Sequence, residues 1–382
     1  MPSHLSQPAL APGAHYLSGN EAAAEGALAA GCGFYAGYPI TPSSEIMERL
    51  AARLPQHGGV FLQMEDEIAS LSAVIGAAWA GKKALTATSG PGLSLMQECL
   101  GYAAFTETPC VLIDVQRAGP CTGQATKVGA GDIMAAKWGS HGDYQVVALS
   151  PWSAQEMFDL TVRAFNWAER LRLPAILLAE EAVGHLRERV DIPQSVDTYQ
   201  RGYTPGAPPF GHPEPGGVPS MPRFGQGEAL MITGSTHDER GFRRTEDPAA
   251  HAALVHRLNH KVLARAGELC QTEGHFLEDA SLVVLAYGFT ARAALKAVKL
   301  ARRQGVKAGL LRLVTLWPFP EEAVAQALAR GARLLVPEMN LGQVAGLARQ
   351  VVGPGLVRPL SQVDGRHITP ATILGALLEM AP

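Results

Sequence analysis

The chain has 382 residues, which is enough for two or three domains of ordinary size. Its 32 lysines and arginines against 35 aspartates and glutamates give a net charge of -3, and no basic run resembles a nucleic-acid-binding stripe, so nucleic acid is not an expected partner. No charged segment leads into an apolar one at the N-terminus, and no apolar run approaches the ~20 residues that span a bilayer, which predicts a cytoplasmic protein without membrane contact.

The first 18 residues are expected to form an extended arm, followed by a small-residue helix from Asn20 to Gly31. Strands and helices then alternate. Strands are predicted over 32–38, 59–64, 83–88, 110–116, 145–150 and 174–180, and helices over 43–54, 66–80, 92–106, 132–138 and 153–171. Because strands such as VLIDV and AILLA are apolar throughout, residues 19–190 are predicted to form a doubly wound α/β domain with a parallel sheet.

Residues 191–227 contain eight prolines among many glycines, which indicates a long surface connection without regular structure. Residues 228–382 are predicted to form a second, smaller α/β domain. It begins with a strand over 228–236 and a helix over 247–269, and three strands follow over 281–288, 308–316 and 333–340. Helices are expected over 291–304, 320–329 and 370–380. Neither a dinucleotide-binding GxGxxG after a strand nor a phosphate-binding GxxxxGK[ST] is present.

The five cysteines form no CxxC pair and lie mostly in apolar segments, at positions 32, 99, 110, 121 and 270. We therefore expect reduced packing thiols, no metal site, and no iron–sulfur cluster held by this chain alone. The histidines at 237, 251, 256 and 260 are expected on a solvated helix face.

The segment 37–45, GYPITPSSE, follows an apolar run and supplies the start of a helix with hydroxyl groups and Glu45. A strand therefore delivers its C-terminal end to a helix N-terminus, which is where ligands bind in open α/β sheets. An ordinary capped turn is the alternative for these nine residues alone.

A second strand-to-helix junction carries three carboxylates. Glu65 and Asp66 suit solvated positions at the start of a helix. Glu67 lies on the buried side of EIASLSAVIGAAWAG, where a carboxylate could exchange a proton with a bound heterocycle.

Two more turns follow apolar strands. The glycines of 88–92, TSGPG, suit close approach to a ligand and equally suit any tight turn. Arg117 at the end of VLIDVQR is placed to bind a substrate carboxylate in a bidentate manner, with an ion pair to Asp114 or Asp143 as the alternative.

Taken together, these motifs resemble a known family. GYPITPSSE, QMEDEIASLSAVIGAAWAG, ATSGPGLSLMQE, VQRAGPCTGQATK, SHGDY, TLWPFPEE and VPEMNLGQ are similar to the α subunit of 2-oxoacid:ferredoxin oxidoreductases, especially the 2-oxoglutarate type, over residues 18–382. The resemblance implies a thiamine-diphosphate pyrimidine-binding fold followed by a transketolase C-terminal-like domain. It also implies oxidative decarboxylation of 2-oxoglutarate to succinyl-CoA, with coenzyme A as co-substrate and electrons passed to ferredoxin.

The resemblance also assigns residues. Glu67, nine positions before Gly76, matches the glutamate that activates thiamine, and Thr41 and Arg117 are the expected catalytic contacts to the oxoacid. By the same resemblance Thr126 is a further substrate-binding candidate. Lys127 is a candidate for the second carboxylate of 2-oxoglutarate on its charge alone, and an exposed loop lysine is the alternative. The expected cofactor contacts, besides Glu67, are Tyr38, Pro39, Ile40, Ser89 and Gly90.

The sequence has no GDG motif, through which thiamine enzymes hold the diphosphate and its metal. A β subunit is therefore expected to supply the diphosphate site, Mg²⁺ and a [4Fe-4S] cluster, in an (αβ)2 heterotetramer. The small domain fused to some α subunits of the family is not expected here. Three alternatives stay open: the same chemistry on pyruvate or branched-chain oxoacids, a non-catalytic assembly subunit, and a transketolase-like sugar enzyme, which would need a diphosphate domain in the same chain.

Overall fold

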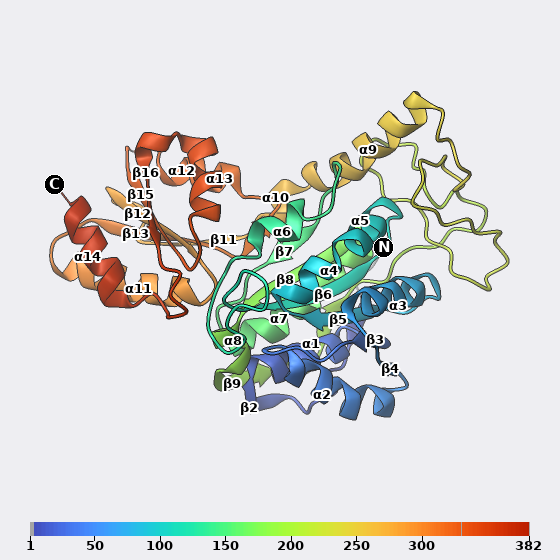
Figure 1. Ribbon diagram of the computed structural model, residues 1–382, viewed down its shortest axis with the longest axis horizontal. Helices are drawn as coiled ribbons and strands as arrows, with labels where there is room; N and C mark the ends of the chain where they lie inside the picture. Colours follow the sequence, from blue (N-terminus) through green and yellow to red (C-terminus); the bar gives the residue numbers. More distant parts are fainter. Residues whose placement is uncertain (1–3, 330, 382) are drawn as a thin grey trace.

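The larger of two helix-covered sheets has seven strands in the order β14-β7-β8-β6-β5-β3-β4 (Figure 1). The computed structural model describes residues 4–329 and 331–381. All six strands predicted within 32–180 are present and parallel: β3 Phe34–Gly37, β4 Val60–Gln63, β5 Ala84–Thr88, β6 Cys110–Gln116, β7 Val147–Leu149 and β8 Pro174–Glu180. Because β5, β6, β7 and β8 are buried along their whole length, their continuous apolar runs fit a sheet covered on both faces.

Two layers of helices cover this sheet. One apolar core includes side chains of α1 Gly19–Ala29, α2 Ser44–Arg53 and α7 Ala154–Leu171. The other includes α3 Glu67–Trp79, α4 Gly90–Leu95, α5 Gln97–Phe105 and α6 Ile133–Trp138. A single helix predicted over 92–106 is wrong in detail, since α4 and α5 are separate helices that meet at the buried Met96. Short elements complete the region: a 3-10 helix, Leu54–His57, and α8 Glu181–His185.

The small residues of α1 have a packing cause. A Cβ at Gly26 would lie 2.5 Å from the carbonyl oxygen of Phe158 in α7. Only glycine permits this approach, so the alanine- and glycine-rich sequence lets α1 lie directly against α7.

The smaller sheet has the order β11-β13-β12-β15-β16. The predicted strands correspond to β12 Leu282–Tyr287, β13 Ala308–Leu313 and β15 Arg333–Glu338. Around them lie α11 Gly288–Arg303, α12 Glu321–Ala327, α14 Pro370–Met380 and a 3-10 helix, Pro354–Leu356. Edge strands β11 Thr272–His275 and β16 Val357–Ser361, together with α13 Gln343–Val352, were not predicted.

The strand predicted over 308–316 is two strands in two sheets. After β13 the chain turns at Val314, and β14 Thr315–Trp317 pairs antiparallel with β7 of the larger sheet. The C-terminal region therefore completes the edge of the N-terminal sheet.

The connection predicted without regular structure over 191–227 holds strand residues at its start, so that expectation is wrong there, because this backbone pairs with the N-terminal arm. β1 His4–Ser6 and β2 Gly13–Ser18 form antiparallel pairs with β10 Val196–Thr198 and β9 Arg187–Ile192. The first three residues of the predicted arm lie outside the described residues. Residues 199–247 hold no named helix or strand (Figure 1), so the strand predicted over 228–236 is wrong. There, Leu230 and Ile232 pack against the core through their side chains, without a strand ladder.

The long helix predicted over 247–269 is interrupted. It consists of α9 Pro248–Leu263 and α10 Ala266–Leu269, with the break at residues 264–265. Lys261 of α9 forms a buried ion pair with Glu107 at 2.8 Å, which fastens α9 to the larger sheet's helices.

The two sheets also meet through polar contacts. The Asn340 side chain donates to the carbonyl of Ala130 at 2.7 Å, and Glu338 accepts hydrogen bonds from the N–H groups of Val344 and Ala345. Asn340 therefore contributes to the contact between the two domains, whereas these hydrogen bonds of Glu338 stay within the second domain.

Within residues 4–329 and 331–381, no helix combines the length and apolar character needed to cross a membrane. The division into an arm (1–18), two domains (19–190 and 228–382) and a linker (191–227) stays a prediction.

Candidate active site

The C-terminal ends of the parallel strands β3, β5 and β6 lie at one edge of the larger sheet. The region outside these strand ends, where ligands bind in open α/β sheets, is called the crevice below. Arg117, directly after β6, donates a hydrogen bond from Nη1 to the carbonyl oxygen of Thr41 at 2.8 Å. The Thr41 turn is fixed from behind, because the buried Asn20 side chain donates to the carbonyl of Pro42 at 2.8 Å. The turn after β3 and the turn after β6, which are far apart in the sequence, are thus joined on one side of the crevice, called here the Arg117 wall.

Glu67 is the first residue of α3, and its side chain is only 5% exposed. Asp66 is the N-cap and accepts a hydrogen bond from the N–H of Ala69 at 2.7 Å, whereas Glu65 is exposed. Among the described residues, no hydrogen bond to the Glu67 carboxylate is found. The three neighbouring carboxylates therefore differ as the helix pattern indicates, and Glu67 alone is buried and free to bind a ligand.

The turn after β5 and the first turn of α4 pack against Glu67. A Cβ at Gly92 would lie 2.6 Å from Cγ and 2.7 Å from Oε1 of Glu67. Ser89 in the same turn is fully buried, and its Oγ has no hydrogen-bond partner in the described part of the chain. The same Cβ would lie 2.0 Å from Oγ1 of Thr88, so glycine at position 92 is required by the close approach of both the Thr88 hydroxyl and the Glu67 carboxylate.

The other predicted contacts are more open. Tyr38 is 40% exposed, and Pro39 and Thr41 are also exposed, whereas Ile40 is half-buried. Gly90 is half-buried in the turn beside Ser89. The crevice therefore has one buried wall, formed by Glu67 and the 88–92 turn, and one open wall.

Thr126 and Lys127 lie on an exposed loop that leaves the sheet at Arg117 and returns beside it. The N–H of Ala118 donates to the carbonyl of Lys127 at 2.9 Å, which closes the loop. The loop brings both residues to the crevice edge, but neither side chain has a hydrogen bond to Thr41 or Arg117.

An ion pair of Arg117 with Asp114 or Asp143 was the alternative to a ligand-binding role. No carboxylate of the described residues lies within 4.0 Å of the Arg117 nitrogens, although the side chain is 92% buried. Its Nε has no partner among the described residues. The guanidinium thus keeps donor capacity beyond its bond to Thr41.

Sequence reasoning missed a pair of buried acids beside this wall. Asp114, on β6, is fully buried, and Asp132 precedes α6. Burial, followed by the charge of Asp132, raises the pKa of Asp114 well above its usual range. Burial raises the pKa of Asp132 to about 6, against the lowering effects of a hydrogen bond with Asp114 and the charge of Arg117. In the sequence, the sign of this pair is one aspartate, Asp114, inside the otherwise apolar strand segment VLIDVQ.

Glu180, at the end of β8, was also missed. Its Oε1 accepts a hydrogen bond from the N–H of Phe289 in α11 at 3.0 Å, and burial raises its pKa to about 8 although that hydrogen bond lowers it. This carboxyl joins the two sheets at the same edge as the crevice.

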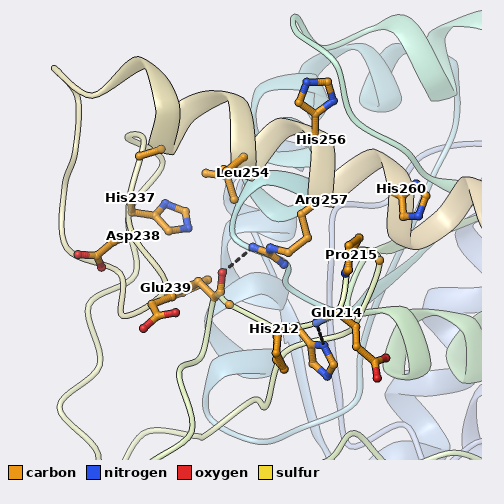
Figure 2. Close-up of a pocket in the computed structure, with 16 residues that line it drawn as sticks. His212, Glu214, Pro215, His237, Asp238, Glu239, Leu254, His256, Arg257 and His260 are labelled. Atoms are coloured by element: carbon orange, nitrogen blue, oxygen red, sulfur yellow. Dashed lines mark hydrogen bonds between the residues drawn. The ribbon is translucent and has the colours of Figure 1, made fainter.

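A separate pocket of about 640 Å³ lies between α9 and the irregular segment (Figure 2). His256 and His260 are exposed there, as expected, but His237 is buried and is held by the carbonyl of Ser235 at 2.9 Å. The solvated position expected for His237 is therefore wrong, because this residue precedes the helix and packs between Phe105 and Phe210. The pocket shares no residue with the crevice.

Family models match two parts of the chain. Residues 25–257 match "Pyruvate flavodoxin/ferredoxin oxidoreductase, thiamine diP-bdg", and residues 280–373 match "Pyruvate:ferredoxin oxidoreductase core domain II".

Curated relatives match almost the whole chain. The 2-oxoglutarate synthase subunit KorA of Methanothermobacter thermautotrophicus is 50% identical over 96% of this chain and 98% of its own length. The ketoisovalerate oxidoreductase subunit VorB of Methanothermobacter marburgensis is 35% identical over 96% of this chain and 97% of its own.

Two solved structures are similar. The 2-oxoglutarate:ferredoxin oxidoreductase from Magnetococcus marinus, with 2-oxoglutarate, coenzyme A and succinyl-CoA bound, has a TM-score of 0.91 and 30% identity. The match covers 96% of this chain and 65% of that one. A split-gene transketolase, an inactive β4 tetramer, has a TM-score of 0.57 at 11% identity over 96% of this chain and 98% of its own, and shows likeness of fold alone.

Proposed function

Because the chain belongs to the pyruvate flavodoxin/ferredoxin oxidoreductase family, we propose that it is the α subunit of a thiamine-diphosphate-dependent 2-oxoglutarate:ferredoxin oxidoreductase. The reaction is the coenzyme A-dependent oxidative decarboxylation of 2-oxoglutarate to succinyl-CoA, with electrons passed to ferredoxin. The single observation that carries this assignment is the buried, unbonded Glu67 carboxylate held against Gly92 in the crevice. The 50% identity to a KorA subunit, against 35% to a VorB subunit, supports 2-oxoglutarate as the acid.

The residues fit the pyrimidine end of thiamine. Bound thiamine diphosphate supplies the nucleophilic carbon and the electron sink that decarboxylation of a 2-oxoacid needs. Glu67 offers a buried carboxylate for exchange of a proton with the aminopyrimidine ring, and its burial keeps competing water away. Tyr38, Pro39, Ile40, Ser89 and Gly90 are the remaining proposed cofactor contacts.

Arg117 and Thr41 are the proposed contacts of the oxoacid. The bond from Nη1 to the Thr41 carbonyl fixes the guanidinium, while Nε has no partner among the described residues. A fixed guanidinium with unused donors suits a carboxylate. Thr126 and Lys127, on the adjoining loop, are proposed to reach the second carboxylate of 2-oxoglutarate.

The site is proposed to be completed by a β subunit. The sequence has no GDG motif, so the diphosphate, Mg²⁺ and the [4Fe-4S] cluster are assigned to that partner, in an (αβ)2 assembly. Large apolar side chains are exposed around the crevice and on edge strand β4, which supports a protein partner there: Tyr38, Val60, Leu62, Ile68 and Leu95. All five thiols are free, which supports a reducing, cytoplasmic location.

The test is co-expression with a candidate β subunit, followed by viologen reduction with coenzyme A and a panel of 2-oxoacids. We expect 2-oxoglutarate to be the preferred substrate and the isolated chain to be inactive. Preference for pyruvate or a branched-chain acid would change the substrate. Activity of the isolated chain would overturn the shared site, and an inactive complex with bound thiamine would favour an assembly role.

A further inference from the structure

Two carboxyl groups lie together behind the Arg117 wall. Both carboxylate oxygens of Asp114, and Oδ2 of Asp132, are buried without a hydrogen-bond donor in the described part of the chain. Asp114 lies opposite Thr88 in the register of β5 and β6, and a Cβ at Gly90, two residues after Thr88, would lie within 3.0 Å of Asp132, so both side chains lie at the start of α4. A hydrogen bond between two carboxyl groups requires one of them to be protonated. Two adjacent buried carboxylates do not both ionise near neutral pH.

The position of Asp132 is fixed by two neighbours, one at the end of β6 and one at the start of α4. The N–H of Asp132 donates to the side-chain oxygen of Gln116 at 3.1 Å. A Cβ at Gly90 would lie 3.0 Å from Oδ2 of Asp132, so the turn beside Glu67 packs directly on this carboxylate. The acids are therefore part of the structure that shapes the crevice.

The positive charge of Arg117 affects one member of this pair, Asp132. Its guanidinium is mostly buried, has no carboxylate within ion-pair distance among the described residues, and lowers the pKa of Asp132. The charged groups that act on Asp132 are Asp114 and Arg117, and the one that acts on Asp114 is Asp132. A buried cation without a direct counter-ion is costly unless a nearby negative charge offsets it.

We propose that Asp114 and Asp132 share one proton and that the negative charge of the ionised member, Asp132, moderates the hold of Arg117 on the substrate carboxylate. The role in substrate binding rests on the proposed function, whereas the shared proton does not. Moderation matters because decarboxylation consumes the carboxylate charge, so a guanidinium that binds the ground state too strongly slows the reaction.

The shared proton is tested by infrared spectroscopy of the protein assembled with its β subunit, in a Glu180→Gln background that removes another protonated carboxyl. At pH 7.5, we expect the band of a protonated carboxyl to be present, to disappear in Asp114→Asn and to persist in Asp132→Asn. If Asp114→Asn leaves the spectrum unchanged, the proposal is overturned, whatever the enzyme's substrate.

The moderating role is tested by steady-state kinetics of Asp132→Asn. Without the negative charge, we expect KM for the oxoacid to fall by about tenfold and kcat to fall with it, a factor that corresponds to ~1.4 kcal/mol. In the wild type, KM should fall as the pH drops through about 6, where Asp132 gains a proton, and this dependence should be absent in the variant. Asp197→Asn on the exposed face of β10 is the control and should keep the wild-type pH profile. A raised KM, or an unchanged pH profile in Asp132→Asn, contradicts the role.

Discussion

Arg117 and Thr41, separated by 76 positions in the chain, are joined by a 2.8 Å hydrogen bond from the guanidinium to a main-chain carbonyl. The bond ties the end of β6 to the turn after β3, the two places where the sequence indicated ligand binding. Because the acceptor is main chain, the contact depends on the identity of residue 117 and not on that of residue 41.

This difference predicts unequal effects of two substitutions. Arg117→Lys removes the planar fork, so we expect KM for 2-oxoglutarate to rise by roughly 10- to 100-fold, the value of a lost charge-assisted hydrogen bond. Thr41→Ala keeps the carbonyl acceptor and should have a smaller effect on KM. Steady-state kinetics of both variants in the assembled enzyme compare the two changes in KM. A larger increase in Thr41→Ala than in Arg117→Lys would contradict this arrangement.

Gly92→Ala should disturb the site through a steric clash. The added methyl group would meet Oγ1 of Thr88 at 2.0 Å and Cγ of Glu67 at 2.6 Å, so both side chains must move and kcat should fall by tenfold or more. Overpacking also costs about 1–3 kcal/mol of stability. Gly76→Ala in α3 is the matched control: nothing lies within 4 Å of its Cβ, and the helix should gain about 0.5–1 kcal/mol. Wild-type kcat in Gly92→Ala would show that the contact is unimportant.

Glu107→Gln should destabilise the fold strongly. Burial would raise the pKa of Glu107, but Lys261, Arg257 and Arg172 together lower it to about 2. Its ion pairs with Arg257 and Lys261 are 2.7 and 2.8 Å long, and the substitution leaves buried cations uncompensated. We expect a loss of about 3–5 kcal/mol in the free energy of unfolding by denaturant titration. Glu379→Gln, at an exposed pair with Arg358, should change it by less than about 1 kcal/mol. Equal losses of unfolding free energy in the two variants would contradict a stabilising role of the buried ion pairs of Glu107.

Glu180 should make stability depend on pH. Its pKa rises from 4.5 to about 8 on folding, so the folded state binds the proton more tightly. This contribution is fully present below the unfolded pKa and is lost as the pH rises through about 8. Glu180→Gln keeps an acceptor for the Phe289 N–H and removes the titration. Thermal unfolding from pH 5 to 9 should therefore show a smaller decline in the variant than in the wild type, and parallel curves would disprove the assignment.

The elements that sequence reasoning found are those with local patterns. The apolar runs of β5, β6 and β8 and the buried side of α3 identified the larger sheet and selected Glu67 over Glu65. Features fixed by distant contacts were missed: β14 is three residues long and gains its strand geometry from β7, and the Asp114–Asp132 pair exists only because α6 begins beside β6. Conversely, 228–236 has an apolar strand-like pattern, but its side chains pack without a partner strand.

The central claim is that Glu67 activates thiamine, and the rate of solvent exchange of the thiamine C2 proton in the assembled enzyme tests it most directly. Glu67→Gln should slow this exchange by roughly 10²- to 10⁴-fold while thiamine diphosphate stays bound, because a positioned acid–base group typically contributes that factor. Glu65→Gln, a substitution of the exposed carboxylate two residues earlier, should leave the exchange rate unchanged. Wild-type exchange in Glu67→Gln with thiamine bound would contradict the account.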